Sequence, residues 1–122
     1  MLELVEMDDS VTLQQQMGLE IAPVILINQF KVRPEEASQL LDAWAHDAAF
    51  LKTQPGFISA QLHRGIGGSG VFINYAVWQS IADFRQAFAQ PEFRRSLAAY
   101  PPSTKASPHL FQKLAVPNIC VI

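Results

Sequence analysis

Two apolar runs limit the folds open to this chain. VILINQFKV spans residues 24–32 and VFINYAVW spans residues 71–78. Near-continuous apolar character in short segments is typical of strands that are covered on both faces. Each run nevertheless has an asparagine in its middle, Asn28 and Asn74. Because a buried amide without a partner costs roughly 1–3 kcal/mol, something should hydrogen-bond to Asn74, and the nature of that group bears on function.

The segment between these runs predicts a helix, a strand and a turn. Pro34 suits the first turn of a helix, and apolar residues recur at helical spacing as far as about residue 53. FISAQLHR, residues 57–64, alternates as a strand. GIGGSG, residues 65–70, holds four of the six glycines and predicts a hairpin turn.

The last third of the chain predicts a second helix and a final strand. Ser80 is a suitable N-cap with Asp83 three residues later, and Pro91 interrupts the helix before a further helical stretch. PPSTKASP, residues 101–108, predicts a loop. HLFQKLAV, residues 109–116, predicts the last strand.

This order of elements predicts an α+β, ferredoxin-like β-α-β-β-α-β fold with an antiparallel sheet. We divide the chain into an N-terminal arm (residues 1–22), one domain (23–116) and a C-terminal tail (117–122). Both helices of such a fold cover one face of the sheet. The opposite face would carry Ile25, Ile27, Val71, Ile73, Tyr75 and Val77. A surface so apolar should not meet water, and pairing two sheets in a homodimer would cover it.

Alternation along the two central strands predicts a pocket on the helix-covered side. One face of the 71–78 strand carries Phe72, Asn74, Ala76 and Trp78. We expect Asn28 and Phe30 of the adjacent strand on the same side, so that two amides and an indole N–H converge where Ala76 leaves room for a ligand. Alternatively, these groups bond to one another or to helix backbone and only order the core, which from spacing alone is the simpler interpretation.

Three segments are similar, in order and spacing, to a known family. They are PVILINQFKVRPEEASQLLDAW, PGFISAQLHR and NYAVWQSIADFRQAF, and together they resemble the antibiotic biosynthesis monooxygenase (ABM) domain family over residues 23–116. The resemblance implies a homodimeric α+β barrel in which two sheets close on each other. It also implies a monooxygenase that oxidises a small phenol, quinol or anthrone-like substrate with O2, without a metal, a flavin or another cofactor.

The resemblance also implies which residues form the site. Asn74 and Trp78 match pocket residues of the family and are the expected catalytic donors to a developing enolate oxygen. The expected substrate-binding residues are Asn28, Phe30, Trp44, Phe72, Ala76 and Phe84. The family's enzymes have a tyrosine at the position of Phe84 and an arginine at the position of Ala98, so the residues that handle protons differ in this chain. Arg94 or Arg95, one turn earlier, is a candidate substitute for that arginine.

Two other functions are weighed against this one. A haem-degrading branch of the fold shares Asn28, but the positions aligned with its helix residues are Ala87 and Leu97, so no axial histidine is available and haem degradation is disfavoured. The remaining alternative is a non-catalytic dimeric barrel that binds a hydrophobic metabolite, because a fold does not fix a function.

Composition narrows the partners and the compartment. The net charge is −2 and no basic stripe is present, so we expect no nucleic-acid partner. His46, His63 and His109 are scattered, and their spacing predicts no metal site; His109 would be a candidate base if it faced the pocket. Cys120 is the single cysteine, so no intrachain disulfide forms. Without a signal peptide or a membrane-spanning run, we expect a cytoplasmic protein and no membrane partner.

Overall fold

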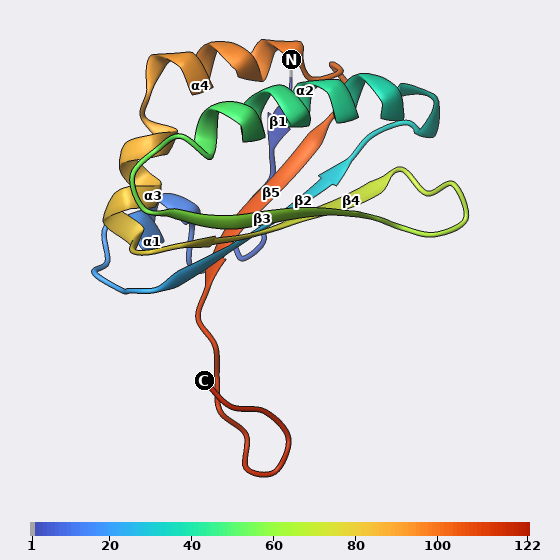
Figure 1. Ribbon diagram of the computed structural model, residues 1–122. Coiled ribbons are helices and arrows are strands. Elements are labelled where there is room, and N and C mark those ends of the chain that lie inside the picture. Colours follow the sequence, from blue (N-terminus) through green and yellow to red (C-terminus); the bar gives the residue numbers. More distant parts are fainter. Residues whose placement is uncertain (1) are drawn as a thin grey trace.

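The computed structural model describes residues 2–122, in which helices cover one face of a five-stranded sheet (Figure 1). The strands are β1 Glu3–Leu4, β2 Val24–Lys31, β3 Phe57–Arg64, β4 Val71–Trp78 and β5 Lys105–Phe111. The helices are α1 Leu13–Met17, α2 Ala37–Leu51, α3 Ile81–Phe88 and α4 Pro91–Ser96, with 3-10 turns η1 Pro34–Glu36 and η2 Leu97–Ala99. Among residues 2–122 no helix has the length and apolar character needed to cross a membrane.

The predicted ferredoxin-like order is confirmed by β2, α2, β3, β4, α3 and β5. The strands lie in the order β1-β5-β2-β4-β3, so β2 and β4 are adjacent and antiparallel at the centre of the sheet. Their register places Asn28 directly opposite Asn74 and Phe30 opposite Phe72. The two central amides therefore share one face, as alternation predicts.

The sheet is not wholly antiparallel, because the N-terminal segment adds an edge strand. Glu3 and Leu4 pair in parallel with Lys105 and Ala106 of β5. This pairing gives partners to backbone groups that an edge strand would otherwise leave open. The division into an arm, a domain and a tail stays a prediction.

The prediction for the last strand was wrong at both ends. It begins at Lys105 within the expected loop and ends at Phe111 rather than at residue 116. Pro108 suggested a loop, since proline lacks the N–H that a sheet requires. The N–H groups of Glu3 and Val5 donate to the carbonyls of Thr104 and Ala106. The backbone N–H and C=O groups of even-numbered residues in β5 therefore point away from β2. Pro108 therefore costs the central pairing no hydrogen bond.

A glutamine side chain continues the edge of β5 beyond β1. The Gln16 side chain accepts from Leu110 N–H at 2.9 Å and donates to Leu110 O at 3.0 Å. Gln16 is held on α1, which begins with a reciprocal capping box between Thr12 and Gln15. Residues 12–18 thus form a helical turn fixed against the last strand.

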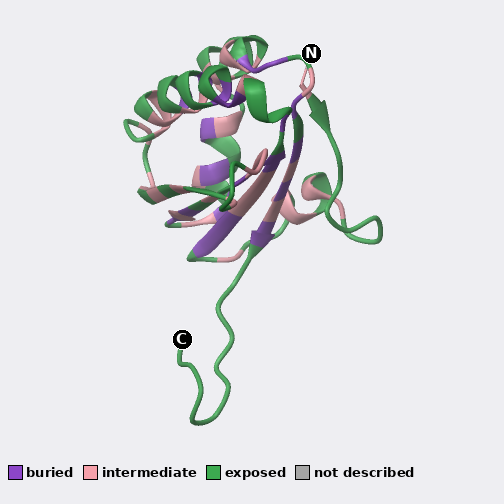
Figure 2. Ribbon diagram, turned by 90° about the vertical axis from the view of Figure 1, so that its right-hand side faces the viewer, coloured by how far each residue is buried: buried purple, intermediate pink, exposed green. Residues whose placement is uncertain are grey.

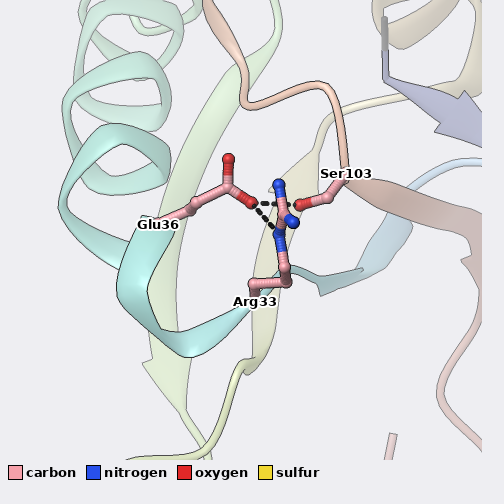
Figure 3. A network of polar contacts seen from close by, with 3 residues as sticks. All are labelled: Arg33, Glu36 and Ser103. Carbon is pink, nitrogen blue, oxygen red and sulfur yellow. Dashed lines mark hydrogen bonds and ion pairs between the residues drawn. The ribbon is translucent and has the colours of Figure 1, made fainter.

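The start of α2 is tied to the loop before β5. Arg33 Nε donates to Glu36 Oε1 at 2.9 Å, and the Ser103 hydroxyl donates to the same oxygen at 2.5 Å (Figure 3). The hydrogen bond from Arg33, followed by that from Ser103, holds the pKa of Glu36 below its ordinary value. These contacts fix the helix end where the chain leaves β2.

The two faces of the sheet differ in their surroundings. Buried residues gather between the sheet and the helices (Figure 2). The opposite face has no helix over it, and Ile73 and Tyr75 are each 37% exposed there. Every residue from Phe111 to Ile122 is also exposed, and this segment extends away from the body of the molecule (Figures 1 and 2).

Candidate functional site

A cavity of about 130 Å³ lies between the sheet and the helices. Its wall is mainly apolar and draws on β2, β4, β5, α2 and the segment from α3 to Tyr100. An engineered apolar cavity of similar size in another protein, roughly 150 Å³, binds benzene. The lining residues are Leu2, Leu4, Leu13, Leu26, Asn28, Phe30, Trp44, Asp47, Ala48, Leu51, Phe57, Ala60, Asn74, Ala76, Trp78, Phe88, Phe93, Leu97, Tyr100, Ala106 and Pro108.

Three polar groups from the central strands face this cavity without protein partners. Asn28 Oδ1, Asn74 Oδ1 and Trp78 Nε1 are buried, and none has a hydrogen-bond partner among residues 2–122. These three atoms therefore do not bond to one another or to helix backbone, as the alternative interpretation would require. Buried polar atoms normally have partners, so these three are available to a ligand.

Aromatic packing fixes the orientation of the site residues. The Trp78 ring meets Phe57 and Phe84 edge-on, with ring centroids 5.4 and 6.1 Å apart. Phe30 stacks on Tyr100 with centroids 5.6 Å apart and planes 12° from parallel. Edge-to-face and offset-stacked geometries are favourable for aromatic pairs, so the indole and the phenol are both held rigidly at the cavity wall.

The same wall contains a buried carboxylate that was not predicted from the sequence. Asp47 of α2 is 3% exposed, and its Oδ2 has no hydrogen-bond partner among the described residues. The Ser96 hydroxyl contacts Asp47 Oδ1 and also lies 2.6 Å from the Phe93 carbonyl oxygen. A hydroxyl has one proton and can satisfy only one of these acceptors.

Burial controls the protonation of this carboxylate. Burial raises the pKa of Asp47, while the hydroxyls of Ser96 and Tyr100 and the nearby charge of His46 oppose that rise. Burial, followed by the negative charge of Asp47, raises the pKa of Tyr100 well above its ordinary value. The cavity therefore holds a phenol that stays neutral and a carboxyl group that accepts a proton more readily than an exposed aspartate.

The signal for Asp47 was its position on the buried stripe of α2. The buried residues of this helix are Ala37, Leu40, Ala43 and Asp47, at helical spacing. A carboxylate at such a position is unusual enough to mark a site. Tyr100 carried no comparable local signal, because it follows η2 in an irregular segment.

The predicted site residues are not all in the cavity wall. Asn28, Phe30, Trp44, Asn74, Ala76 and Trp78 line the cavity. Phe72 is buried in the neighbouring core cluster, and Phe84 is fully buried behind Trp78 and Phe88; neither is a lining residue.

The other candidate groups also lie outside the cavity. His109 alternates with the lining residues Ala106 and Pro108 and meets Gln16 and Phe111, so it does not face the pocket. Arg94 and Arg95 are exposed on α4, and neither replaces the family's arginine at the wall. Among residues 2–122, no three His, Cys, Asp or Glu side chains are grouped as a metal ion would require.

The N-terminal segment contributes to the cavity in a way that the sequence analysis did not anticipate. Leu2, Leu4 and Leu13 are lining residues. Leu4 is 67% exposed, which places it at the mouth rather than in the interior. The arm therefore narrows the cavity from the side of β1 and α1.

A match to a known family model identifies the family of this chain. The family model described as "Antibiotic biosynthesis monooxygenase" matches residues 23–99. The chain belongs to the antibiotic biosynthesis monooxygenase family. The matched region contains β2, α2, β3, β4 and α3, and so includes the central strands that carry the unpaired amides and indole.

Curated relatives of this ABM chain include two monooxygenases from Streptomyces. It is 39% identical over 70 residues to tetracenomycin-F1 monooxygenase of Streptomyces glaucescens, covering 57% of this chain. It is 36% identical over 76 residues to deoxynogalonate monooxygenase of Streptomyces nogalater, covering 62% of this chain. The aligned regions span 62% and 64% of the lengths of these two relatives.

Solved structures share the ABM fold over most of the chain. SnoaB from Streptomyces nogalater, described as a cofactor-independent oxygenase, superposes with a TM-score of 0.70 at 29% identity, covering 80% of this chain and 99% of SnoaB. A putative monooxygenase from Shewanella loihica superposes with a TM-score of 0.67 at 35% identity, covering 81% of this chain and all of that one. The core of the structure is thus shared, whereas part of this chain lies outside the superposition.

Proposed function

We propose that this protein is a cofactor-independent monooxygenase that oxidises a small phenol, quinol or anthrone-like substrate with O2. The proposal rests on the unpaired Asn28, Asn74 and Trp78 groups that face an apolar cavity. Membership of the ABM family and the named activities of the relatives support it. A cavity of about 130 Å³ favours a ring system that is small or only partly enclosed.

The proposed reaction uses the electron-rich substrate itself as the reductant of O2. Loss of the phenol or enol proton gives an oxyanion, which transfers an electron to O2, and recombination forms a carbon–oxygen bond. For a substrate CH2 group, O2 then converts CH2 to C=O and releases one water, so both oxygen atoms are accounted for. The protein must bind the substrate, stabilise the oxyanion and exclude water.

Asn74 and Trp78 are the groups suited to the oxyanion. The NH2 group of the Asn74 amide and the indole N–H of Trp78 are neutral donors held on one face of β4; the indole N–H is itself unpaired, whereas the unpaired atom of the Asn74 amide is its acceptor oxygen. Preorganised donors of this type stabilise charge that develops in a transition state, and removal of one such donor in another enzyme costs about 10²–10³ in rate. Asn28, opposite Asn74 in the register, is the third polar group that meets the substrate.

We further propose that two copies pair through the open sheet face. This face carries Ile27, Ile73, Tyr75 and Val77 without a covering helix. The segment after β5 adds exposed apolar side chains at Leu114, Val116, Ile119, Val121 and Ile122. A second copy of the chain would cover both apolar surfaces.

Light scattering during size-exclusion chromatography tests the homodimer. The expected mass is twice 13.6 kDa, and Tyr75→Glu should shift it to the monomer value by placing a charge in the interface. Gln86→Glu on the exposed side of α3 is the matched control and should stay dimeric. A monomeric wild type at micromolar concentration would contradict the proposal.

The competing function is a non-catalytic barrel that binds a hydrophobic metabolite in the same cavity. An O2 electrode separates the two, with a monocyclic hydroquinone, a naphthohydroquinone and an anthrone as the panel and a chelator present. Saturable uptake that falls in Asn74→Ala and Trp78→Phe, but not in Gln86→Ala, is the expected result. Uptake at the rate of the buffer blank by folded protein would favour the binding function.

A further inference from the structure

Asp47 is the single carboxylate among the cavity-lining residues, and its environment is not explained by packing. It projects from α2 into the same cavity as Asn28 and Asn74. Burial of a carboxylate beside only two hydroxyls, those of Ser96 and Tyr100, carries a large desolvation cost. An asparagine would accept the same hydrogen bond from Ser96 without that cost, so contact with α4 does not account for a carboxylate here.

The free oxygen of Asp47 is the group that a substrate would meet. Oδ1 is occupied by the Ser96 hydroxyl, whereas Oδ2 has no hydrogen-bond partner in residues 2–122. The phenol of Tyr100 and the amides of Asn28 and Asn74 line the same cavity. A phenolic substrate that donates its O–H to Oδ2 would lie in the same cavity as Asn74 and Trp78, the proposed donors to the oxyanion.

We propose that Asp47 is the catalytic base of this pocket. The proposal rests on the monooxygenase function proposed above and assigns its first step. The substrate O–H bond breaks, its electron pair stays on the substrate oxygen, and the proton moves to Asp47 Oδ2. The carboxylate becomes a neutral acid while the substrate becomes the oxyanion that O2 oxidises, so the charge of the cavity does not change.

The groups around Asp47 suit this role. Tyr100, from the end of η2, and His46, from α2 itself, are the titratable groups that influence it. The sheet contributes neutral amides and α4 contributes the Ser96 hydroxyl, while Arg94 and Arg95 of α4 are exposed. Because burial raises the pKa of Asp47, the group is a stronger base than an exposed aspartate. It would supply proton handling in a chain that lacks the family's tyrosine and arginine.

The test compares Asp47→Asn with Asp42→Asn, an exposed aspartate on the same helix. With the best substrate of the panel, we expect kcat/KM to fall about 10²–10⁴-fold in Asp47→Asn, the range for loss of a general base. The wild-type rate should rise with pH through the titration of Asp47. That rise should be absent in Asp47→Asn, and the deficit should narrow as the medium ionises the substrate. Asp42→Asn should match the wild type in rate and pH profile.

The outcomes separate this inference from the proposed function. Oxidation by wild type with an unchanged rate and pH profile in Asp47→Asn overturns the base and leaves the monooxygenase standing. If wild type oxidises no substrate of the panel, the proposed monooxygenase function fails. The binding of naphthol, measured by its fluorescence, then decides the role of Asp47. The informative pH range is the one in which free naphthol stays neutral. A naphthol affinity that rises with pH there in wild type, but not in Asp47→Asn, supports an ionised Asp47 carboxylate that accepts from the phenol O–H. Affinity independent of pH in both, or no binding, overturns it.

Discussion

The two faces of β4 both place side chains in unusual surroundings: polar atoms are buried on one face, and apolar side chains are exposed on the other. On the helix side, Asn74 and Trp78 hold polar atoms that are buried and unpaired. On the open side, Ile73 and Tyr75 are apolar or aromatic and 37% exposed. A soluble fold alone would favour neither arrangement. We infer that the buried face is shaped for a ligand and the exposed face for a second copy of the chain.

The largest expected contrast between the faces is in stability. Trp78→Ala should lower the free energy of unfolding by about 3–5 kcal/mol, because it removes a buried ring from contact with Phe57 and Phe84. Tyr75→Ala on the other face should cause a loss that grows with protein concentration, because in the proposed homodimer its contacts are between copies. Urea unfolding at two protein concentrations measures both. Equal, concentration-independent losses would contradict the contrast.

A second substitution separates stability from activity on the buried face. Asn74→Leu should stabilise the protein by roughly 1–3 kcal/mol, because a buried amide oxygen without a partner is replaced by an apolar group. The same change should abolish oxidation. Thermal unfolding and O2 uptake on one preparation measure the two effects, with Gln86→Leu as the exposed control. A destabilised Asn74→Leu protein would indicate that the amide has a structural role.

The pH dependence of stability tests the burial of Asp47 independently of any substrate. Since burial raises the pKa of Asp47, the folded protein keeps this proton at pH values where the unfolded chain has lost it. Its contribution is therefore fully present below about pH 4, the ordinary aspartate range, and is lost as the pH rises to the raised pKa. Asp47→Asn cannot ionise, so its stability relative to wild type should increase over this interval, by about 1.4 kcal/mol for each pKa unit.

Urea unfolding at a series of pH values provides the measurement for Asp47→Asn. Asp42→Asn is the control, and its difference from wild type should show no such rise. A relative stability of Asp47→Asn that shrinks as the pH increases would mean that ionised Asp47 stabilises the fold, contrary to the environment described here.

The smallest expected effect concerns the arm at the mouth of the cavity. Leu4→Ala should leave stability nearly unchanged, because Leu4 is mostly exposed, but it should widen the opening. We expect the ratio of kcat/KM for the anthrone to that for the monocyclic hydroquinone to rise by roughly tenfold, the scale of a small change in an apolar pocket. Leu19→Ala, exposed and outside the cavity wall, should leave the ratio unchanged. No change in Leu4→Ala would mean that the arm does not limit substrate size.

The sequence by itself determined the central strands, the main helix and the face on which each central side chain lies. Strand residues alternate and helical residues recur every three or four positions, so the bounds of β3 and β4 and the shared side of Asn28 and Asn74 followed from local pattern. The family was also recognisable from the order of these segments.

Only the tertiary structure decided which residues meet in the cavity. Ser96 reaches Asp47 across 49 positions of sequence and Gln16 reaches Leu110 across 94, and no local period encodes such contacts. The same holds for the extra pairing of β1 with Lys105 and Ala106 of β5, and for the N-terminal leucines in the cavity wall. Periodicity fixes the side of an element on which a residue lies, whereas the packing of distant elements fixes what that residue touches.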